Sequence, residues 1–148
     1  MLIYRVASAR YPVNDGYGAK LSGGRWNHQG TAVIYAAQSI ALCALEVLAN
    51  VDELPQDYVS IEIEIPEHLN WTVLEADDMP PDWENTPPSD RTRGMGTTWA
   101  ASLSTAVLVV PSVVIPRERN FILNPAHPAF QDIRFGTPEP FDFDPRLK

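Results

Sequence analysis

The pattern of hydrophobic and polar residues predicts one strand and one helix with particular clarity. Apolar and polar residues alternate over Tyr58–Ile65, which is typical of a strand with one buried face and with Glu62 and Glu64 on its solvent face. Residues Ile40–Ala49 are rich in alanine and leucine, and their apolar side chains recur at helical spacing. Ser39 precedes this segment and is a suitable N-cap, so we expect the helix to begin at Ile40.

Shorter apolar runs and turn residues place the remaining elements. Further strands are expected at Leu2–Val6, Ala32–Ala36, Trp71–Leu74, Ala106–Val110 and Phe121–Leu123. A second helix is expected at Thr97–Ser104, whereas the glycine-rich Asp15–Gly24 and the proline-rich Asp77–Asp90 are expected to be loops. The tail from Phe135 onward should hold a loop and a short edge strand. Because strands and helices do not alternate regularly, the pattern predicts a single α+β domain over residues 1–148, with few helices.

Composition narrows the class of protein. The chain is 45% hydrophobic and 20% charged, which is an ordinary globular balance and excludes a disordered chain. Its longest apolar stretch falls well short of the roughly 20 residues that a membrane span needs, and its N-terminus has no signal-peptide pattern. The single cysteine, Cys43, excludes a disulfide framework and a cysteine-based zinc site. We therefore expect a cytoplasmic protein that does not associate with membranes.

The net charge of −8 is unevenly distributed. Residues 1–50 hold four basic and two acidic side chains, whereas residues 51–148 hold seven basic and seventeen acidic ones, a net charge of −10. The stretch Val51–Asp90 has twelve acidic residues and no Lys or Arg. Such a surface repels phosphate backbones, which argues against direct binding of nucleic acid. The acidic stretch is either a solvated surface or a docking site for a basic protein partner.

Three common kinds of site find little support. The histidines are far apart in the sequence and form no HExxH-type pair, so no metal site is predicted. Gly16–Gly18 begins a GxGxxG pattern, but Leu21 stands where the third glycine belongs. Ser112 and His127 are conceivable partners in a hydrolase, but no GxSxG motif surrounds Ser112.

Glu46 is the most informative residue of the sequence. It is the only carboxylate between Asp15 and Asp52, and it lies inside the apolar helix. A helix with apolar residues most of the way round is expected to be substantially buried. A carboxylate in such a helix is costly unless it is paired or faces a cavity. Glu46 is therefore either an ordinary surface residue or a carboxylate that points into a cleft beside a positive charge.

Four further residues are candidates for binding a ligand. Arg25 follows Gly23–Gly24, which allow tight bends, and its guanidinium can bind a phosphate through two hydrogen bonds. Arg5, on the first strand, is a second candidate, although each arginine could instead form a surface salt bridge. Tyr35 could stack on a planar ring or belong to the core. Ser112 ends a buried strand and could reach a ligand or occupy a turn. Together these residues suggest a site for a phosphorylated ligand that contains a sugar.

An ordered series of motifs resembles the RES domain family. The matching segments are Gly18-Ala19, GGRWN at Gly23–Asn27, Gly30, Tyr35, Ala41–Leu48, Val110–Ser112, Asn120, Asn124-Pro125 and His127-Pro128. The Arg, Glu and Ser for which the family is named match Arg25, Glu46 and Ser112. The resemblance covers roughly Leu2–Phe130, but the segment Pro80–Pro88 and the tail match nothing in the family.

The resemblance implies a toxin of a bacterial toxin–antitoxin pair. It implies a fold similar to ADP-ribosyltransferases, in which short strands form two packed sheets around an NAD-binding cleft. Family members consume NAD⁺ by hydrolysis or phosphorolysis of the nicotinamide–ribose bond, so NAD⁺ is expected as a substrate and no resident cofactor is expected. The implied partner is an Xre-like helix-turn-helix antitoxin that covers the active site of the toxin. The antitoxin, and not the toxin, would contact DNA.

The resemblance also implies a role for each candidate. Arg5 and Arg25 would bind the diphosphate of NAD⁺, Tyr35 would pack against the nicotinamide or its ribose, and Ser112 would position the ribose or the acceptor. Glu46 would stabilise the positive charge that develops as the glycosidic bond breaks. Transfer of ADP-ribose to a protein, and an inactive module that binds a helix-turn-helix partner, remain as alternatives. An RNA-cleaving toxin is a third, which the acidic charge of residues 51–148 disfavours.

Overall fold

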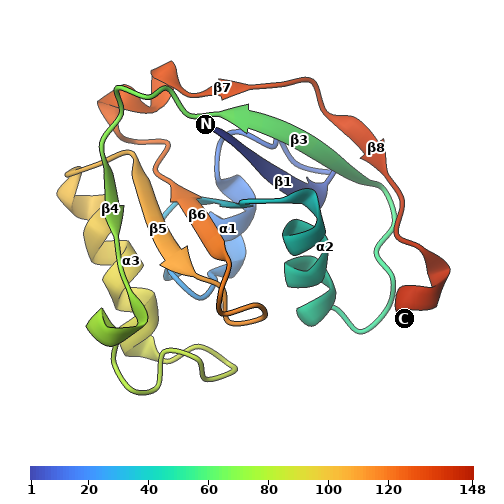
Figure 1. The fold of residues 1–148 in the computed structure, drawn as a ribbon, viewed down its shortest axis with the longest axis horizontal. Coiled ribbons are helices and arrows are strands. Elements are labelled where there is room, and N and C mark those ends of the chain that lie inside the picture. The colour runs from blue at the N-terminus through green and yellow to red at the C-terminus, as the bar shows by residue number, and fades with distance from the viewer.

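All strands of the protein belong to one continuous, bent sheet (Figure 1). The computed structural model describes residues 1–148. The strands are β1 (Leu2–Ser8), β2 (Ile34–Ala37), β3 (Tyr58–Glu64), β4 (Trp71–Val73), β5 (Val107–Pro111), β6 (Arg119–Leu123), β7 (Arg134–Phe135) and β8 (Glu139–Phe141). The helices are α1 (Tyr17–Ser22), α2 (Ile40–Ala49) and α3 (Asp90–Ser102), with 3-10 turns η1 (Ala76–Asp78), η2 (Pro128–Asp132) and η3 (Pro145–Leu147).

The sheet consists of two halves that meet at a short ladder. The strand order is β4-β5-β6-β2-β1-β3-β7, with β8 also paired to β3, and only the β4–β5 pair is parallel. Strands β1 and β2 pair only at Tyr4 and Ala37, whereas β1 and β3 pair along their full lengths. The two packed sheets expected from the resemblance are therefore not separate, because this short ladder joins the halves. The expectation of an α+β fold with few helices is confirmed.

Alternation along the strands sends side chains into different apolar clusters. Ile3, Ile61, Ile63, Val107 and Phe121 belong to the central cluster between the two halves. The opposite face of β5 and β6 packs under α3, in a cluster that includes three tryptophans. Helix α2 packs against β1 and β2 in a third cluster. The helices thus pack on the outer face of the bent sheet. Side chains from the strands fill the space inside the bend.

The two clearest sequence predictions are confirmed. Strand β3 buries Ile61 and Ile63 and exposes Glu62 and Glu64, as the alternation predicted. Helix α2 begins at Ile40, where the Ser39 hydroxyl accepts a hydrogen bond from the backbone N–H of Leu42 (3.1 Å). The other predicted strands are present with ends shifted by one or two residues.

Helix α2 is less buried than its composition suggested. Only Leu42, Cys43 and Leu48 are buried, while the side chains of Ile40 and Leu45 are 37% and 39% exposed. A single stripe of the helix rests on β1 and β2, and the rest faces outward. The expectation of a helix buried on most sides is therefore wrong, although Glu46 itself is half-buried.

Two segments expected to be loop or short helix are more regular than predicted. The glycine-rich segment Asp15–Gly24 contains α1, which lies between Gly16 and Gly23, both with positive φ. Helix α3 begins at Asp90, seven residues before the predicted start at Thr97, because Ser89 caps it. The first turns of α3 are polar and glycine-containing, so they carry neither a hydrophobic period nor high helix propensity.

The C-terminal tail adds two short strands. Both β7 and β8 pair with β3, where the sequence indicated a single edge strand. No helix of the structure combines the length and the hydrophobicity required to cross a bilayer.

Candidate functional site

The carboxylate of Glu46 is held by two polar side chains from the sheet. Its Oε1 accepts a hydrogen bond from the Ser112 hydroxyl (2.6 Å) and another from the Asn120 side-chain amide (2.9 Å). Ser112 directly follows β5, and Asn120 lies on β6 opposite Val110. Because alternate residues of a strand share a face, Ser112 and Asn120 point to the same side of this strand pair. Both bonds go to Oε1, which leaves Oε2 free to interact with a ligand.

Ser112 is fixed in one orientation. The residue is fully buried, and its backbone N–H donates to the carbonyl of Glu118 (2.9 Å). Its hydroxyl accepts a hydrogen bond from the backbone N–H of Ile115 (3.0 Å) and gives its only proton to Glu46. The structure thus brings Glu46 and Ser112 together through this hydrogen bond, and the role of Ser112 in positioning the ribose or the acceptor stays a prediction.

Asn120 is a site residue that we did not single out from its chemistry. Its side-chain nitrogen binds Glu46, and its side-chain oxygen is buried without a hydrogen-bond partner. The available signal was a polar residue one position before the apolar run Phe121–Leu123, within one of the segments that resemble the family. Asn120 lies 74 residues after Glu46, and no local sequence pattern indicates a contact over that separation.

Arg25 is bound to the proline-rich loop. Its guanidinium donates hydrogen bonds to the carbonyls of Trp83 (2.9 Å) and Asn85 (2.7 Å) and to the Thr86 hydroxyl (3.2 Å). Burial lowers the pKa of Arg25, and the charge of Glu46 is the main influence that raises it. Arg25 therefore lies within electrostatic range of Glu46 without a direct hydrogen bond to it. Its binding of phosphate stays a prediction.

Tyr35 supports the loop that carries Arg25. Its hydroxyl donates to the side-chain oxygen of Asn27 (2.6 Å) and accepts from the backbone N–H of Trp26 (3.0 Å). Burial raises the pKa of the tyrosine. A Cβ atom at Gly24 would lie 2.7 Å from this hydroxyl, so only glycine fits there without a shift. The hydroxyl of Tyr35 is therefore already hydrogen-bonded within the protein. The packing of its ring against nicotinamide stays a prediction.

Arg5 is bound to the backbone of β2. Its guanidinium donates to the backbone carbonyl of Tyr35 (2.8 Å), and its Nε is buried without a partner. Burial lowers the pKa of Arg5, and the charges that oppose this effect most are those of Cys43 and Asp15. No hydrogen bond or salt bridge joins Arg5 to Glu46, and its binding of phosphate stays a prediction.

Two other candidate chemistries can be compared with the geometry. The hydroxyl of Ser112 donates to Glu46, while His127 accepts a hydrogen bond from the N–H of Ala129 (3.0 Å) at the start of η2. The conceivable Ser112–His127 pair is therefore not formed. No three His, Cys, Asp or Glu side chains are grouped so that they could hold a metal ion.

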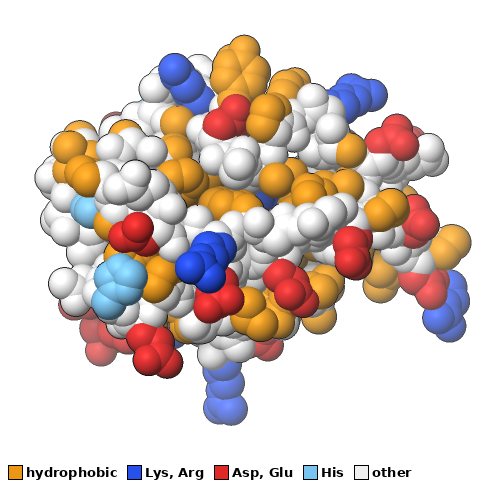
Figure 2. All heavy atoms as spheres, turned by 90° about the horizontal axis from the view of Figure 1, so that it is seen from above, with side chains coloured by type: hydrophobic (Ala, Val, Ile, Leu, Met, Phe, Trp, Pro, Cys, Tyr) orange, Lys and Arg blue, Asp and Glu red, His pale blue; other side chains and the backbone are white.

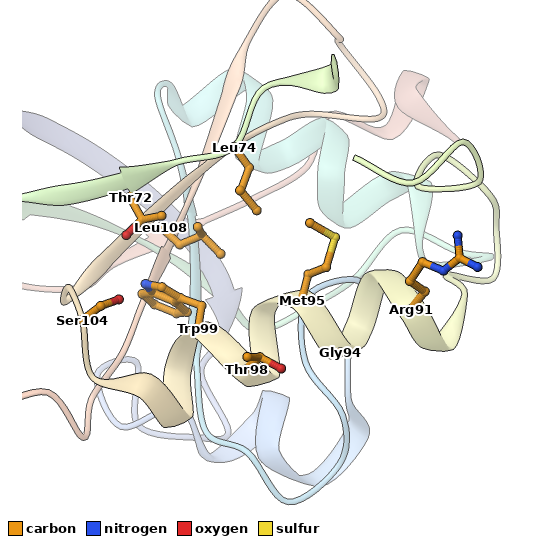
Figure 3. Close-up of a pocket in the computed structure, with 9 residues that line it drawn as sticks. All are labelled: Thr72, Leu74, Arg91, Gly94, Met95, Thr98, Trp99, Ser104 and Leu108. Atoms are coloured by element: carbon orange, nitrogen blue, oxygen red, sulfur yellow. The ribbon is translucent and has the colours of Figure 1, made fainter. Parts of the chain in front are cut away.

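A hollow of the surface lies away from Glu46. It has a volume of about 520 Å³ and lies between α3 and strands β4 and β5, lined by Leu74, Met95, Trp99 and Leu108, with Arg91 at one end (Figure 3). None of the residues around Glu46 lines it. On the face seen in Figure 2, basic side chains stand apart from one another among acidic ones, and they form no basic patch there.

Comparison with known proteins identifies the family. The chain belongs to the RES domain family, whose sequence model matches residues 2–144. It is 40% identical over 153 residues to a Toxin Res of Yersinia enterocolitica, with complete coverage of both chains. It is 38% identical over 143 residues to the Prs ADP-ribosylating toxin of a Sphingobium species, covering 93% of this chain and 89% of the other.

A solved structure shares the fold. The crystal structure of the M. tuberculosis MbcT–MbcA toxin–antitoxin complex contains a chain that matches this one with a TM-score of 0.70. The match covers 99% of this chain and 85% of the other chain at 19% sequence identity. At that identity, the similarity demonstrates a common fold and nothing further.

Proposed function

We propose that the protein is the toxin of a toxin–antitoxin pair and that it cleaves the nicotinamide–ribose bond of NAD⁺ by hydrolysis or phosphorolysis. The observation that carries this proposal is the half-buried carboxylate of Glu46, oriented through Oε1 by Ser112 and Asn120 with Oε2 left free. Membership of the RES domain family and the relatives named Toxin Res support the assignment to toxins.

The chemistry suits a single carboxylate. As the bond between ribose C1 and the nicotinamide nitrogen breaks, its electron pair passes to the ring nitrogen, and nicotinamide leaves as a neutral molecule. The leaving group needs no proton, so no general acid is required. Positive charge develops on the ribose, and a fixed carboxylate stabilises such an oxocarbenium-like transition state. Water or phosphate then bonds to C1 and, in the case of water, releases a proton.

Arg25 would bind the diphosphate while it stays attached to the loop. Its three observed hydrogen bonds involve the two terminal nitrogens, and a guanidinium has five N–H donors. Donors therefore remain for a phosphate oxygen. In this arrangement, the loop holds the guanidinium in place, and the energetic cost of ordering it on binding is reduced.

The proposed partner is an antitoxin of the Xre-like helix-turn-helix type. Two observations support an antitoxin in general: the relatives named Toxin Res, and the fold shared with a chain of a toxin–antitoxin complex. Co-expression with the product of an adjacent gene should restore growth if that product is the antitoxin, and a chain without a helix-turn-helix motif that does so would refute the proposed type.

A second candidate is transfer of ADP-ribose to a protein. It is favoured by one specific observation, the 38% identity to a relative named Prs ADP-ribosylating toxin over 93% of this chain. Both reactions break the same nicotinamide–ribose bond, and they differ only in the group that attacks C1. Mass spectrometry of cellular proteins after expression would distinguish them, because only the transfer leaves proteins with an added ADP-ribose.

The decisive experiment replaces the carboxylate with its amide. Glu46→Gln keeps the size of the side chain and removes its charge, so NAD⁺ consumption by the purified protein should fall by roughly 100-fold or more. Glu67→Gln, at an exposed position, is the matched control and should behave as wild type. Wild-type turnover in the Glu46→Gln variant would remove Glu46 from the mechanism. A wild-type protein that leaves NAD⁺ intact would refute the function.

A further inference from the structure

Arg93 on α3 is an arginine without a partner. The residue is half-buried, its Nε is buried without a hydrogen-bond partner, and no salt bridge of the structure includes it. Three of the other arginines are engaged: Arg25 binds the proline-rich loop, Arg119 pairs with Glu75, and Arg146 pairs with Asp144. An unpaired charge in a partly buried position is unfavourable unless a ligand completes it.

The packing of α3 directs Arg93 toward the loop that carries Arg25. The buried stripe of α3 includes Gly96, which lies directly against the backbone of Trp26, since a Cβ atom there would lie only 1.8 Å from the Trp26 carbonyl oxygen. Residues three apart on a helix share a face, so Arg93 lies one turn from this contact on the same side. The backbone N–H of His28 donates a hydrogen bond to the Thr97 hydroxyl (2.9 Å). This bond holds the loop against the helix.

The electrostatics agree with this placement. Burial is the main reason that the pKa of Arg25 is lowered, and the charge of Arg93 acts in the same direction while Glu46 opposes it. Arg93 also acts to lower the pKa of Tyr35, against the stronger effect of burial. Arg93 therefore lies within electrostatic range of both residues. Two guanidinium charges within range of each other repel, and an anion bound between them would relieve the repulsion.

We propose that Arg93 is a further substrate-binding residue, which together with Arg25 holds the diphosphate of the dinucleotide. The identity of the ligand rests on the function proposed above, whereas the site itself rests on the two guanidiniums. A diphosphate within NAD⁺ carries two negative charges, and each guanidinium can donate two parallel hydrogen bonds to phosphate oxygens. Arg93 would thus supply the second cation of the site, the part expected of Arg5 from the sequence.

Binding of ADP tests the site without requiring turnover. ADP carries a diphosphate and lacks the bond that the enzyme would cleave. By calorimetry, Arg93→Ala should bind ADP about tenfold or more weakly than wild type. Arg91→Ala is the matched control, because Arg91 is an exposed arginine two residues away that lines the apolar hollow (Figure 3), and it should bind ADP as wild type does.

Two further measurements separate binding from a structural role. Removing an unpaired charge should leave the melting temperature of Arg93→Ala unchanged or higher, whereas a structural arginine would lower it. Arg93→Lys keeps the charge without the planar donors, so its affinity for ADP should lie between those of wild type and Arg93→Ala. Should the alanine variant fold poorly, Arg93→Gln replaces it in the same assay.

The outcomes distinguish this inference from the proposed function. Equal ADP affinity in wild type and Arg93→Ala, or no ADP binding by wild type at millimolar concentration, overturns the diphosphate site. If wild type consumes NAD⁺, Arg93→Ala should raise KM about tenfold with a small change in kcat, and an unchanged KM refutes the inference alone. If ADP binding depends on Arg93 but NAD⁺ is not consumed, the diphosphate site stands and the proposed function fails.

Discussion

Ser112 determines how the Glu46 carboxylate is presented. Its hydroxyl both donates to Glu46 and accepts from Ile115, so Ser112→Ala removes one of two donors and leaves the Ile115 N–H unpaired. We expect kcat for NAD⁺ consumption to fall roughly 10- to 100-fold with little change in KM. Ser104→Ala, at an exposed serine, is the control. A loss confined to KM would instead assign Ser112 to substrate binding.

Cys43 should be chemically inert in the folded protein. Burial raises the pKa of its thiol to about 12, and the thiol donates to the carbonyl of Tyr4 (3.1 Å). Since the thiolate is the reactive form, a thiol reagent at about pH 8 should label the protein only after denaturation. Rapid labelling of the folded protein would contradict this.

The same shift fixes the direction of a pH effect. The folded pKa of Cys43 is raised above that of an unfolded cysteine, so its contribution to stability is fully present below the ordinary thiol pKa. That contribution is lost as the pH rises through about 12. Denaturation at increasing pH checks the sign, and a stability that increased across this range would exclude the assigned shift.

At the level of single residues, the sequence singled out candidate side chains but did not indicate most of their hydrogen-bond partners. Glu46 and Ser112 were identified, and they contact each other. Arg25 and Tyr35 were identified too, but their observed partners are the proline-rich loop and Asn27. These partners depend on the path of loops, and no periodic pattern in the sequence encodes such a path.

Helix α3 depends on a glycine for its position. At Gly96 an added Cβ would collide with the Trp26 carbonyl, whereas at Gly94 the nearest atom is 3.7 Å away in the His28 ring. We expect Gly96→Ala to lower the free energy of unfolding by about 3 kcal/mol or more, because the helix must move. Gly94→Ala should be neutral or stabilising by up to about 1 kcal/mol. Equal effects in chemical denaturation would contradict this packing.

The elements differ in how well the sequence predicts them. Helix α2 and strand β3 were predicted because a regular hydrophobic period runs through each of them. The first half of α3 was missed because its sequence contains two glycines and several polar residues. One of them, Gly96, packs closely against Trp26 of the GGRWN loop, so a tertiary contact has overridden local helix propensity there.

For the whole molecule, strand identity was more predictable than strand pairing. The sequence indicated most of the strands, but not that β2 would pair with β6 and β1 with β3. The resemblance implied two sheets, and the observed sheet is continuous because β1 and β2 still share a single residue pair. Such pairings join residues far apart in the chain, and the loops between them give no local signal of the register.

The spacing of the donors around Glu46 has a consequence for biosynthesis. The two side chains that orient the carboxylate follow it by 66 and 74 residues, one directly after β5 and the other on β6. A nascent polypeptide that has emerged from the ribosome only as far as α3 possesses the acid but neither donor. The oriented carboxylate can therefore form only once β6 has been synthesised, so we expect an inhibitor of this site to act on the completed chain.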